Sequence, residues 1–199
     1  MSLEGTPPGP IARYSKAGYS KDGTVLTVGS MSKLFWGGLR VGWIRRPVAA
    51  IAQLARVKTG ADLGSALITQ AIAAQLLTEL DQAKTIRRDQ FSRRRDLLAS
   101  LLRKRLPEWK FTEPKGGLFL WVRLPSGDAR CFAQCAARHA VVVTPGSMFA
   151  ADESFTDHLR IPYVLDEAAL ALGVDRLAAA WSEYRNLADA RLTRSAPIV

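Results

Sequence analysis

Short apolar runs and helix-like spacing alternate along the first half of the chain. Residues 24–29 form an apolar run that is typical of a strand, and residues 39–45 predict a second short strand, antiparallel or at a sheet edge. A helix is expected to start at Pro47, since proline suits the first helical turn, and to run to about Lys58. Residues 59–62, which include a glycine, are expected to end it.

The longest helical pattern lies in the middle of the chain. Apolar residues recur at helical spacing from Ser65, which we expect to cap the helix, as far as Leu106, where Pro107 stops the pattern. A helix of about 40 residues is long for a globular protein, so the pattern predicts a kink or break near residues 80–83.

After Pro107 the pattern changes to α+β. Strands are expected at residues 110–112, 118–124, 140–143 and 158–163, a turn at 114–117, a short amphipathic helix at 129–139, and a final helix from 166 to about 191 that frays from 193. The chain as a whole is therefore predicted to be of the α/β class with an α+β C-terminal part.

Composition narrows the class of protein. The chain has 199 residues, of which 48% are hydrophobic and 23% charged, as is typical of a soluble globular protein. No apolar run approaches the ~20 residues of a membrane helix, and the N-terminus lacks the order of a secretory signal, so we expect no membrane partner and a cytoplasmic location. Residues 1–23 predict a turn-rich lead-in, and residues 1–3 are typical of an expression leader.

The two cysteines and one of the histidines lie four residues apart on the helix predicted at 129–139. A straight helix separates Cys131 from His139 by ~12 Å, which is too far for one tetrahedral zinc ion with ligand bonds near ~2 Å. We therefore expect no metal site and expect the thiols of Cys131 and Cys135 to face a core, in a reducing compartment.

Positive charge is concentrated in one segment. Residues 84–105 hold nine basic and two acidic side chains and so supply +7 of the formal net charge of +10. Apolar residues such as Phe91 and Leu98 interleave them at helical spacing, which favours a solvated polar face on an amphipathic helix. Nucleic-acid binding by this helix is the weaker alternative.

Three further expectations concern side chains near strand ends. We expect Trp36 and Trp43 to be core residues, because aromatic side chains in such positions usually are. Strand alternation predicts that Arg123 faces solvent. His158 is expected to have a structural role.

The strongest chemical signal follows the first predicted strand. Lys33 follows two hydroxyl residues, Ser30 and Ser32, and Arg40 comes seven residues after it with two glycines between. A lysine amine can form an imine with an aldehyde, and two hydroxyls with a guanidinium can hold a phosphate dianion. We expect Gly37–Gly38 to let the backbone fold back so that Lys33 and Arg40 face one ligand.

These residues resemble the lysine-and-phosphate motif of fold-type I pyridoxal-phosphate enzymes, the aspartate aminotransferase superfamily. The sequence Trp-Gly-Gly-Leu-Arg at 36–40 is most similar to the aminotransferase-like domain of MocR-type regulators, a subfamily of the GntR family. The resemblance implies that Lys33 is the catalytic residue, binding pyridoxal 5'-phosphate as a Schiff base and later moving a proton. It implies a phosphate site made by Ser30, Ser32 and Arg40.

A second constellation lies in the C-terminal part. The order of the small domain of this superfamily is repeated by Gly116-Gly117 before an apolar strand, then Pro145-Gly146, then Leu159-Arg160-Ile161. A buried guanidinium needs an anionic partner, and the resemblance implies that Arg160 binds the substrate α-carboxylate. An exposed edge-strand arginine and an internal ion pair are the open alternatives.

The resemblance covers residues 6–192 but only the C-terminal half of a fold-type I protein. It implies a remnant of the cofactor-binding large domain at 24–82 and a complete small domain at 83–199, which includes the long connecting helix. Three functional groups of the family are expected upstream of the lysine motif: a glycine-rich turn for phosphate, an aromatic that stacks on the pyridine ring, and an aspartate for the ring nitrogen.

The resemblance thus implies the C-terminal part of an aminotransferase-like protein that acts on an amino acid and a 2-oxo acid. The wording at 36–40 favours the effector domain of a MocR-type regulator, which would bind DNA only through an N-terminal helix-turn-helix; a free-standing class I/II aminotransferase is the alternative. A homodimer is expected, and the chain alone is expected to have weak or no transaminase activity.

Overall fold

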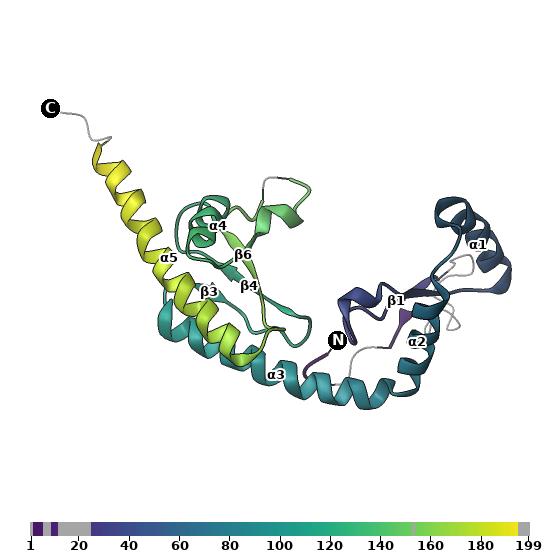
Figure 1. The fold of residues 1–199 in the computed structure, drawn as a ribbon. Helices are drawn as coiled ribbons and strands as arrows, with labels where there is room; N and C mark the ends of the chain where they lie inside the picture. The colour runs from purple at the N-terminus through teal and green to yellow at the C-terminus, as the bar shows by residue number, and fades with distance from the viewer. Residues whose placement is uncertain (1, 6–8, 12–24, 153, 195–199) are drawn as a thin grey trace. The chain divides into compact units, whose positions relative to one another are not determined.

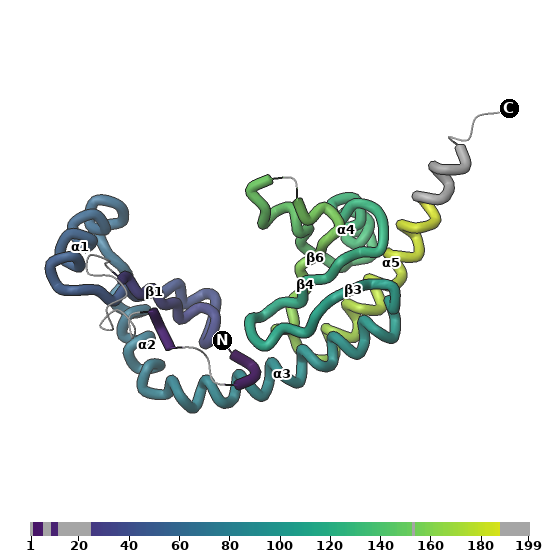
Figure 2. Tube along the Cα trace, turned by 180° about the vertical axis from the view of Figure 1, so that it is seen from behind, coloured from purple at the N-terminus to yellow at the C-terminus, as the bar shows by residue number. Residues whose placement is uncertain are grey.

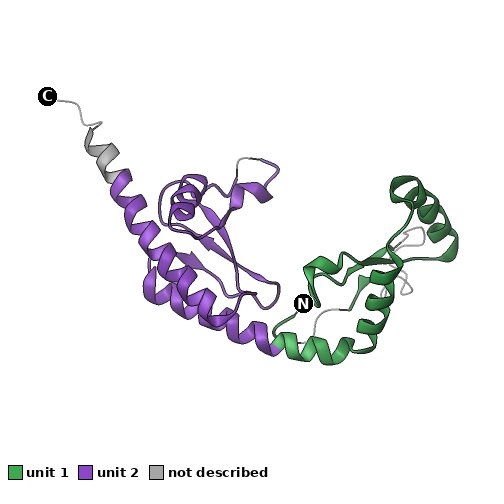
Figure 3. Ribbon diagram, viewed as in Figure 1, with its two compact units in different colours: residues 1–88 green, residues 89–199 purple. Residues whose placement is uncertain are grey.

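The computed structural model describes residues 2–5, 9–11, 25–152 and 154–194, with side chains to residue 187. The chain forms two compact units, residues 1–88 and 89–199 (Figure 3). Most of the predicted lead-in and the tail from residue 195 lie outside the described residues. None of the described helices is both long enough and apolar enough to cross a membrane.

The first unit is built on a two-stranded antiparallel ribbon. β1 (Thr27–Ser30) pairs with β2 (Gly42–Arg45), and Ser30 lies opposite Gly42. A short 3-10 turn, η3 (Gly37–Leu39), lies in the connection between the strands. The predicted antiparallel pairing is confirmed, although both strands are shorter than the apolar runs that predicted them.

The helix after β2 is longer than predicted. α1 (Val48–Asp62) continues through the expected break at 59–62. The Thr59 hydroxyl donates to the Ala55 carbonyl at 2.9 Å, and Lys58 pairs with Asp62 at 2.6 Å, so the polar residues are satisfied within the helix. The helix ends instead at Leu63, which adopts a left-handed φ of 58°.

Two further helices follow. α2 (Leu67–Thr78) begins after Ala66 with no side-chain cap, so the expectation that Ser65 caps it is wrong. α3 (Leu80–Arg105) follows directly, with Glu79 between the helices at φ −98°. The break predicted near 80–83 is therefore confirmed one residue earlier. The first turns of α3 belong to the first unit and the rest to the second.

The core of the first unit is small. Its buried cluster consists of Met31, Leu39 and Ala73, with Phe35, Val41 and Leu76 packed against it. α1 has no fully buried residue. Large apolar side chains stand in solvent on the ribbon and on both helices: Val28, Ile44, Val48, Val57, Leu67 and Ile68.

The second unit contains an antiparallel sheet of four strands in the order β3-β4-β6-β5. Figures 1 and 2 label β3, β4 and β6 of this sheet. The strands are β3 (Lys110–Phe111), β4 (Phe119–Arg123), β5 (Thr144–Pro145) and β6 (His158–Pro162). β4 and β6 are the central pair, and alternate residues on each are buried: Leu120, Val122, Leu159 and Ile161.

Helices complete the core of this unit. α4 (Ala129–Arg138) packs on α5 (Glu167–Arg194), and Leu98 of α3 lines a small apolar cavity with Ile161 and Val174. Aromatic rings meet edge to face or stacked between α4, α5 and the loop after α3: Trp109, Phe132, Trp181 and Tyr184. Asp128 caps α4 by accepting from the amides of Arg130 and Cys131.

The strand predicted at 140–143 is wrong. Ala140 has a left-handed φ of 55°, and the amides of His139 and Val141 donate back to the Ala136 carbonyl, so this segment closes α4. Pairing with β6 begins only at Thr144. Apolar composition alone predicted the strand, yet only Val143 of the apolar residues is buried.

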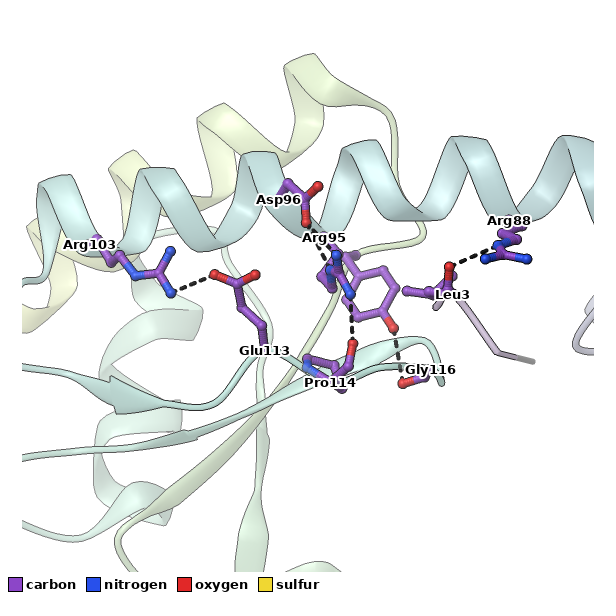
Figure 4. A network of polar contacts seen from close by, with 9 residues as sticks. Leu3, Arg88, Arg95, Asp96, Arg103, Glu113, Pro114 and Gly116 are labelled. Atoms are coloured by element: carbon purple, nitrogen blue, oxygen red, sulfur yellow. Dashed lines mark hydrogen bonds and ion pairs between the residues drawn. The ribbon is translucent and has the colours of Figure 1, made fainter. Parts of the chain in front are cut away.

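The basic face of α3 is not merely solvated, contrary to our expectation. Arg94 donates to the Val164 carbonyl at 2.8 Å, and Arg88 to the Leu3 carbonyl at 2.9 Å. Arg95 is 6% exposed and bonds to Asp96 and to the Pro114 carbonyl (Figure 4). Backbone carbonyls are thus the partners of several of these guanidinium groups.

We expect the amides of α1 to exchange with solvent at least about 100-fold faster than those of β4 and β6. α1 buries no side chain fully, so its opening breaks few tertiary contacts, whereas the central strands carry the core. Hydrogen exchange followed by mass spectrometry on the 199-residue chain measures both. Equal protection of α1 and β4 would contradict this account of the first unit.

Candidate functional site

The lysine motif forms the connection between β1 and β2. The Met31 amide donates to the Val41 carbonyl at 3.0 Å, which closes the connection immediately after the strands end. The Phe35 amide donates to the Met31 carbonyl at 3.0 Å, so Lys33 lies in a tight turn directly after β1. Arg40 precedes Val41 and therefore lies at the opposite end of the same closed loop.

A guanidinium of α3 holds the far side of this turn. Arg87 Nε donates to the Leu34 carbonyl at 3.2 Å, and its Nη2 donates to the Phe35 carbonyl at 3.1 Å. Two bonds from a planar donor to adjacent carbonyls fix the backbone that carries Lys33. Sequence reasoning missed this role, because Arg87 was grouped with a basic face expected to be solvated.

Lys33 and Ser30 share a cavity of about 440 Å³. Three residues of one face of α3 also line it: Lys84, Thr85 and Arg88. The cavity is therefore strongly basic, as a site for an anionic ligand requires. The i, i+1, i+4 spacing on α3 is the signal that could have predicted these lining residues.

Ser32 and Arg40 are not among the residues that line this cavity. The Ser32 amide donates to Ser30 Oγ at 3.3 Å, which joins the two serines in one turn. Arg40 is exposed and makes no hydrogen bond or ion pair with any described residue. The structure thus brings Ser30 and Lys33 together and places Ser32 and Arg40 on the same loop.

The two glycines before Arg40 do not have the expected role. Neither has a positive φ, and the left-handed residue of the loop is Arg40 itself, at φ 51°. A Cβ added to Gly38 would lie 2.4 Å from the Trp36 indole, so Gly38 makes room for a ring. Gly29 does the same for Trp43, its cross-strand neighbour, at 2.1 Å.

These two indoles lie on the surface. Trp36 is 68% exposed and Trp43 is 45% exposed, so the expectation that they are core residues is wrong. Neither lines the cavity beside Lys33. Each ring covers a glycine of its own strand pair or loop instead of entering the small core of the unit.

Arg160 lies at the centre of the sheet of the second unit. Its strand, β6, has β4 on one side and β5 on the other, and Arg160 is opposite Trp121 and Thr144. It is therefore not an edge-strand arginine. Within the described part of the chain no carboxylate forms an ion pair with it.

Phenyl rings, rather than an acid, contact the Arg160 guanidinium. Its Cζ lies 4.2 Å from the centroid of Phe119 and 4.0 Å from that of Phe149. Its Nε is buried and has no hydrogen-bond partner among the described residues.

Two hydrogen bonds from side chains hold the turn predicted at 114–117, which precedes β4. Arg95 Nη1 donates to the Pro114 carbonyl at 2.9 Å, and the buried Tyr163 hydroxyl donates to the Gly116 carbonyl at 3.4 Å (Figure 4). Burial raises the pKa of Tyr163, so its hydroxyl stays a donor. Gly117 has φ +97°, which requires a glycine.

Charged residues flank the start of β6. Arg123 Nε donates to Asp157 at 2.6 Å, and His158 Nδ1 contacts the same carboxylate at 2.6 Å while its ring stacks on Trp121. Arg123 is 62% exposed, as predicted, and His158 fits its expected structural role. The hydrogen bond from Arg123 is the main cause that lowers the pKa of Asp157.

α4 carries one exposed and one buried cysteine. Cys131 is exposed, so the expectation that it faces the core is wrong, whereas Cys135 is buried as predicted. The ligand atoms of Cys135, His139 and Glu183 lie within 4.8 Å of one another. Each already has a protein partner: Cys135 Sγ reaches the Ala180 carbonyl, and His139 Nε2 is 2.7 Å from Glu183. This cluster fastens α4 to α5.

Comparison with known proteins gives one matching family model and relatives of two kinds, aminotransferases and transcriptional regulators. A family model described as aminotransferase class I and II matches residues 4–177. The chain is 34% identical over 160 residues to the 2-aminoadipate transaminase of Thermus thermophilus, covering 78% of this chain and 40% of that protein. It is 32% identical over 167 residues to the uncharacterized HTH-type transcriptional regulator YdfD of Bacillus subtilis, covering 81% of this chain and 33% of that protein.

Solved structures of two aminotransferases have a fold similar to that of this chain. LysN, the α-aminoadipate aminotransferase of Thermus thermophilus complexed with N-(5'-phosphopyridoxyl)-L-leucine, has a TM-score of 0.83 at 29% identity, covering 94% of this chain and 48% of that one. The kynurenine aminotransferase of Pyrococcus horikoshii has a TM-score of 0.78 at 28% identity, covering 92% and 45%. The chain spans about a third to a half of the length of these relatives.

Replacing Asp157 should make the chain less sensitive to acid. Because the folded state lowers the pKa of Asp157, this carboxylate contributes stability above its unfolded pKa, and the contribution is lost as pH falls through the folded pKa. At neutral pH we expect Asp157→Asn to cost about 1 kcal/mol or less, since the pair is partly exposed.

Urea unfolding at a series of pH values from 7 down to 2 measures this dependence. The difference between wild type and Asp157→Asn should shrink below about pH 4. Arg123→Gln removes the main cause of the shift and should remove most of the dependence as well. A difference that stays constant with pH would show that the carboxylate has no such role.

Proposed function

Because this chain belongs to the aminotransferase class I and II family, we propose that it is the C-terminal part of a pyridoxal-phosphate-dependent aminotransferase-like protein. The observation that carries the proposal is the shared cavity of Ser30 and Lys33 at the end of β1, lined by further cations. The donors fit the cofactor: the Lys33 amine for an aldehyde, and the hydroxyls of Ser30 and Ser32 with the Arg40 guanidinium, on the same loop, for a phosphate.

Each residue of the loop has a distinct task in this proposal. Lys33 Nζ holds the cofactor through its aldehyde carbon, and when released it serves as the base that takes a proton from the substrate α-carbon. Ser30, Ser32 and Arg40 hold the phosphate, with Arg40 supplying the charge. When bound, the cofactor supplies the electron sink that makes the α-proton acidic.

Arg87 and Arg160 support this chemistry from other elements. Arg87 fixes the turn that aims Lys33, through its bonds to two adjacent carbonyls. Arg160 binds the α-carboxylate of the substrate, since its guanidinium lacks an acidic partner among the described residues and its terminal nitrogens are not committed. The substrates are then an amino acid and a 2-oxo acid.

The biological setting has two candidates. Both aminotransferases and HTH-type regulators are among the relatives, and the sequence at 36–40 favours the effector domain of a MocR-type regulator. In that setting the whole protein acts in the cytoplasm as a homodimer and binds DNA through a separate N-terminal domain. A reading frame with a basic helix-turn-helix of about 70 residues upstream distinguishes the regulator from a free-standing aminotransferase.

Borohydride reduction tests the role of Lys33. After incubation of the 199-residue chain with pyridoxal 5'-phosphate and reduction, we expect the pyridoxyl label to be several-fold enriched on Lys33 relative to Lys58 and Lys84. Peptide mass spectrometry measures the site of labelling, and Lys33→Ala should lose the enriched label.

Two controls make this test specific. Pyridoxal without its phosphate should label Lys33 less selectively, and Arg40→Gln should reduce labelling by the phosphorylated form but not by pyridoxal. Lys84 lies in the same cavity, so it is a demanding internal reference. Labelling shared among the lysines in proportion to their exposure would overturn the proposed role of Lys33.

A further inference from the structure

The face of the second sheet that points away from the core carries aromatic rings around a central arginine, Arg160. Strand alternation puts one set of β4 and β6 residues on this face: Phe119, Trp121, Arg123, His158, Arg160 and Pro162. The 3-10 turn η4 (Gly146–Phe149) adds Phe149, whose ring lies 6.2 Å from that of Trp121. Arg160 is therefore surrounded by ring carbon.

The contacts of Arg160 are unusual for a half-buried arginine. Both phenyl centroids lie well inside the 6 Å range of a cation–π contact. The buried Nε has no partner among the described residues, and no ion pair forms there. The guanidinium is thus oriented by the rings, while its charge stays uncompensated.

This arrangement suits a site that must bind an outside carboxylate. An internal aspartate or glutamate would orient the guanidinium equally well, but the incoming carboxylate would then have to displace it. Phenyl rings orient the cation and exclude water from its surface without occupying the terminal N–H groups. An entering carboxylate therefore meets a preorganised donor pair.

We infer that Phe119 and Phe149 are positioning residues of the substrate carboxylate site, which hold the Arg160 guanidinium in place of an acidic partner. The inference rests on the proposed role of Arg160 in binding the α-carboxylate. Phe119 acts from the neighbouring strand β4, and Phe149 from the turn that follows β5, so the two rings reach the cation from different elements.

Leucine replacements of the two phenylalanines test the inference, because leucine keeps an apolar side chain and removes the ring. The probe is 2-oxo-4-methylpentanoate, with its methyl ester as the neutral control. Titration of the 199-residue chain, followed by backbone amide NMR shifts, gives the Kd. We expect Phe149→Leu and Phe119→Leu each to raise the Kd by about 3- to 30-fold.

A spectroscopic signature separates positioning from general stability. Ring currents of Phe119 and Phe149 should displace the Arg160 Nε–Hε resonance from those of the solvent-exposed arginines. Phe149→Leu should move it back toward them, while Phe149→Tyr, which keeps a ring, should retain both the resonance and the Kd. Unchanged sheet amides will show that the variants remain folded.

Phe155 offers a matched control. It is 47% exposed, as is Phe149, and its ring contacts Trp121 and His158 rather than the Arg160 guanidinium. Phe155→Leu should therefore leave both the Kd and the Arg160 resonance unchanged. An equal effect of Phe155→Leu would point to a general weakening of the aromatic face and would overturn the specific role.

Arg160→Gln distinguishes the two levels of the proposal. If it leaves the Kd unchanged, or if the wild-type chain does not bind the probe at all, the carboxylate role of Arg160 fails and the positioning inference fails with it. If Arg160→Gln abolishes binding while both leucine variants bind as the wild type does, only the positioning inference is overturned.

Discussion

Guanidinium groups that bind backbone carbonyls hold the functional loops of this chain in place. Arg87 bonds to two successive carbonyls of the turn that carries Lys33, and Arg95 bonds to the Pro114 carbonyl at the start of the glycine turn before β4. Both arginines belong to α3, so a single helix supplies the fixed donors for each unit separately. A loop carbonyl satisfied in this way does not need a second strand or an ordered water, which lets short, irregular loops stay in defined positions.

The two units differ in how many of their apolar side chains are buried. The second unit buries both central strands, and aromatic rings fill the space between its helices. The first unit has a small core and exposes apolar residues on its ribbon and helices. The chain covers only 33% and 48% of the length of two of its relatives.

Local rules predicted most elements of this chain, and its motifs indicated the family. Helical and strand periodicity located β4, β6, α4 and α5, and the order of Lys33, its serines and Arg40 was enough to indicate the family. Errors arose where a residue type has two uses. Glycine and threonine at 59–62 suggested a break, but the threonine hydroxyl bonds within the helix. Valines at 141–143 suggested a strand, yet they follow a left-handed residue that closes α4.

Tertiary contacts account for the other errors, since no local rule contains them. A basic helical face looks the same in sequence whether its guanidiniums meet water or the carbonyls of distant loops. The rings around Arg160 come from separate segments, so their meeting depends on strand order and register. The basic residues that α3 adds to the Lys33 cavity could not be predicted for the same reason, because α3 lies far along the chain from Lys33.

The close approach of an indole to a glycine occurs twice in the ribbon, at Trp36 with Gly38 and at Trp43 with Gly29. At either glycine, even a methyl group would occupy the volume that the indole now fills, so the ring would have to leave its place. Substitutions in this loop are therefore coupled. A bulkier residue at position 29 fits only if Trp43 is replaced by a smaller residue, and one at position 38 only if Trp36 is. In divergent versions of the loop we therefore expect each glycine to be replaced only together with the tryptophan that covers it.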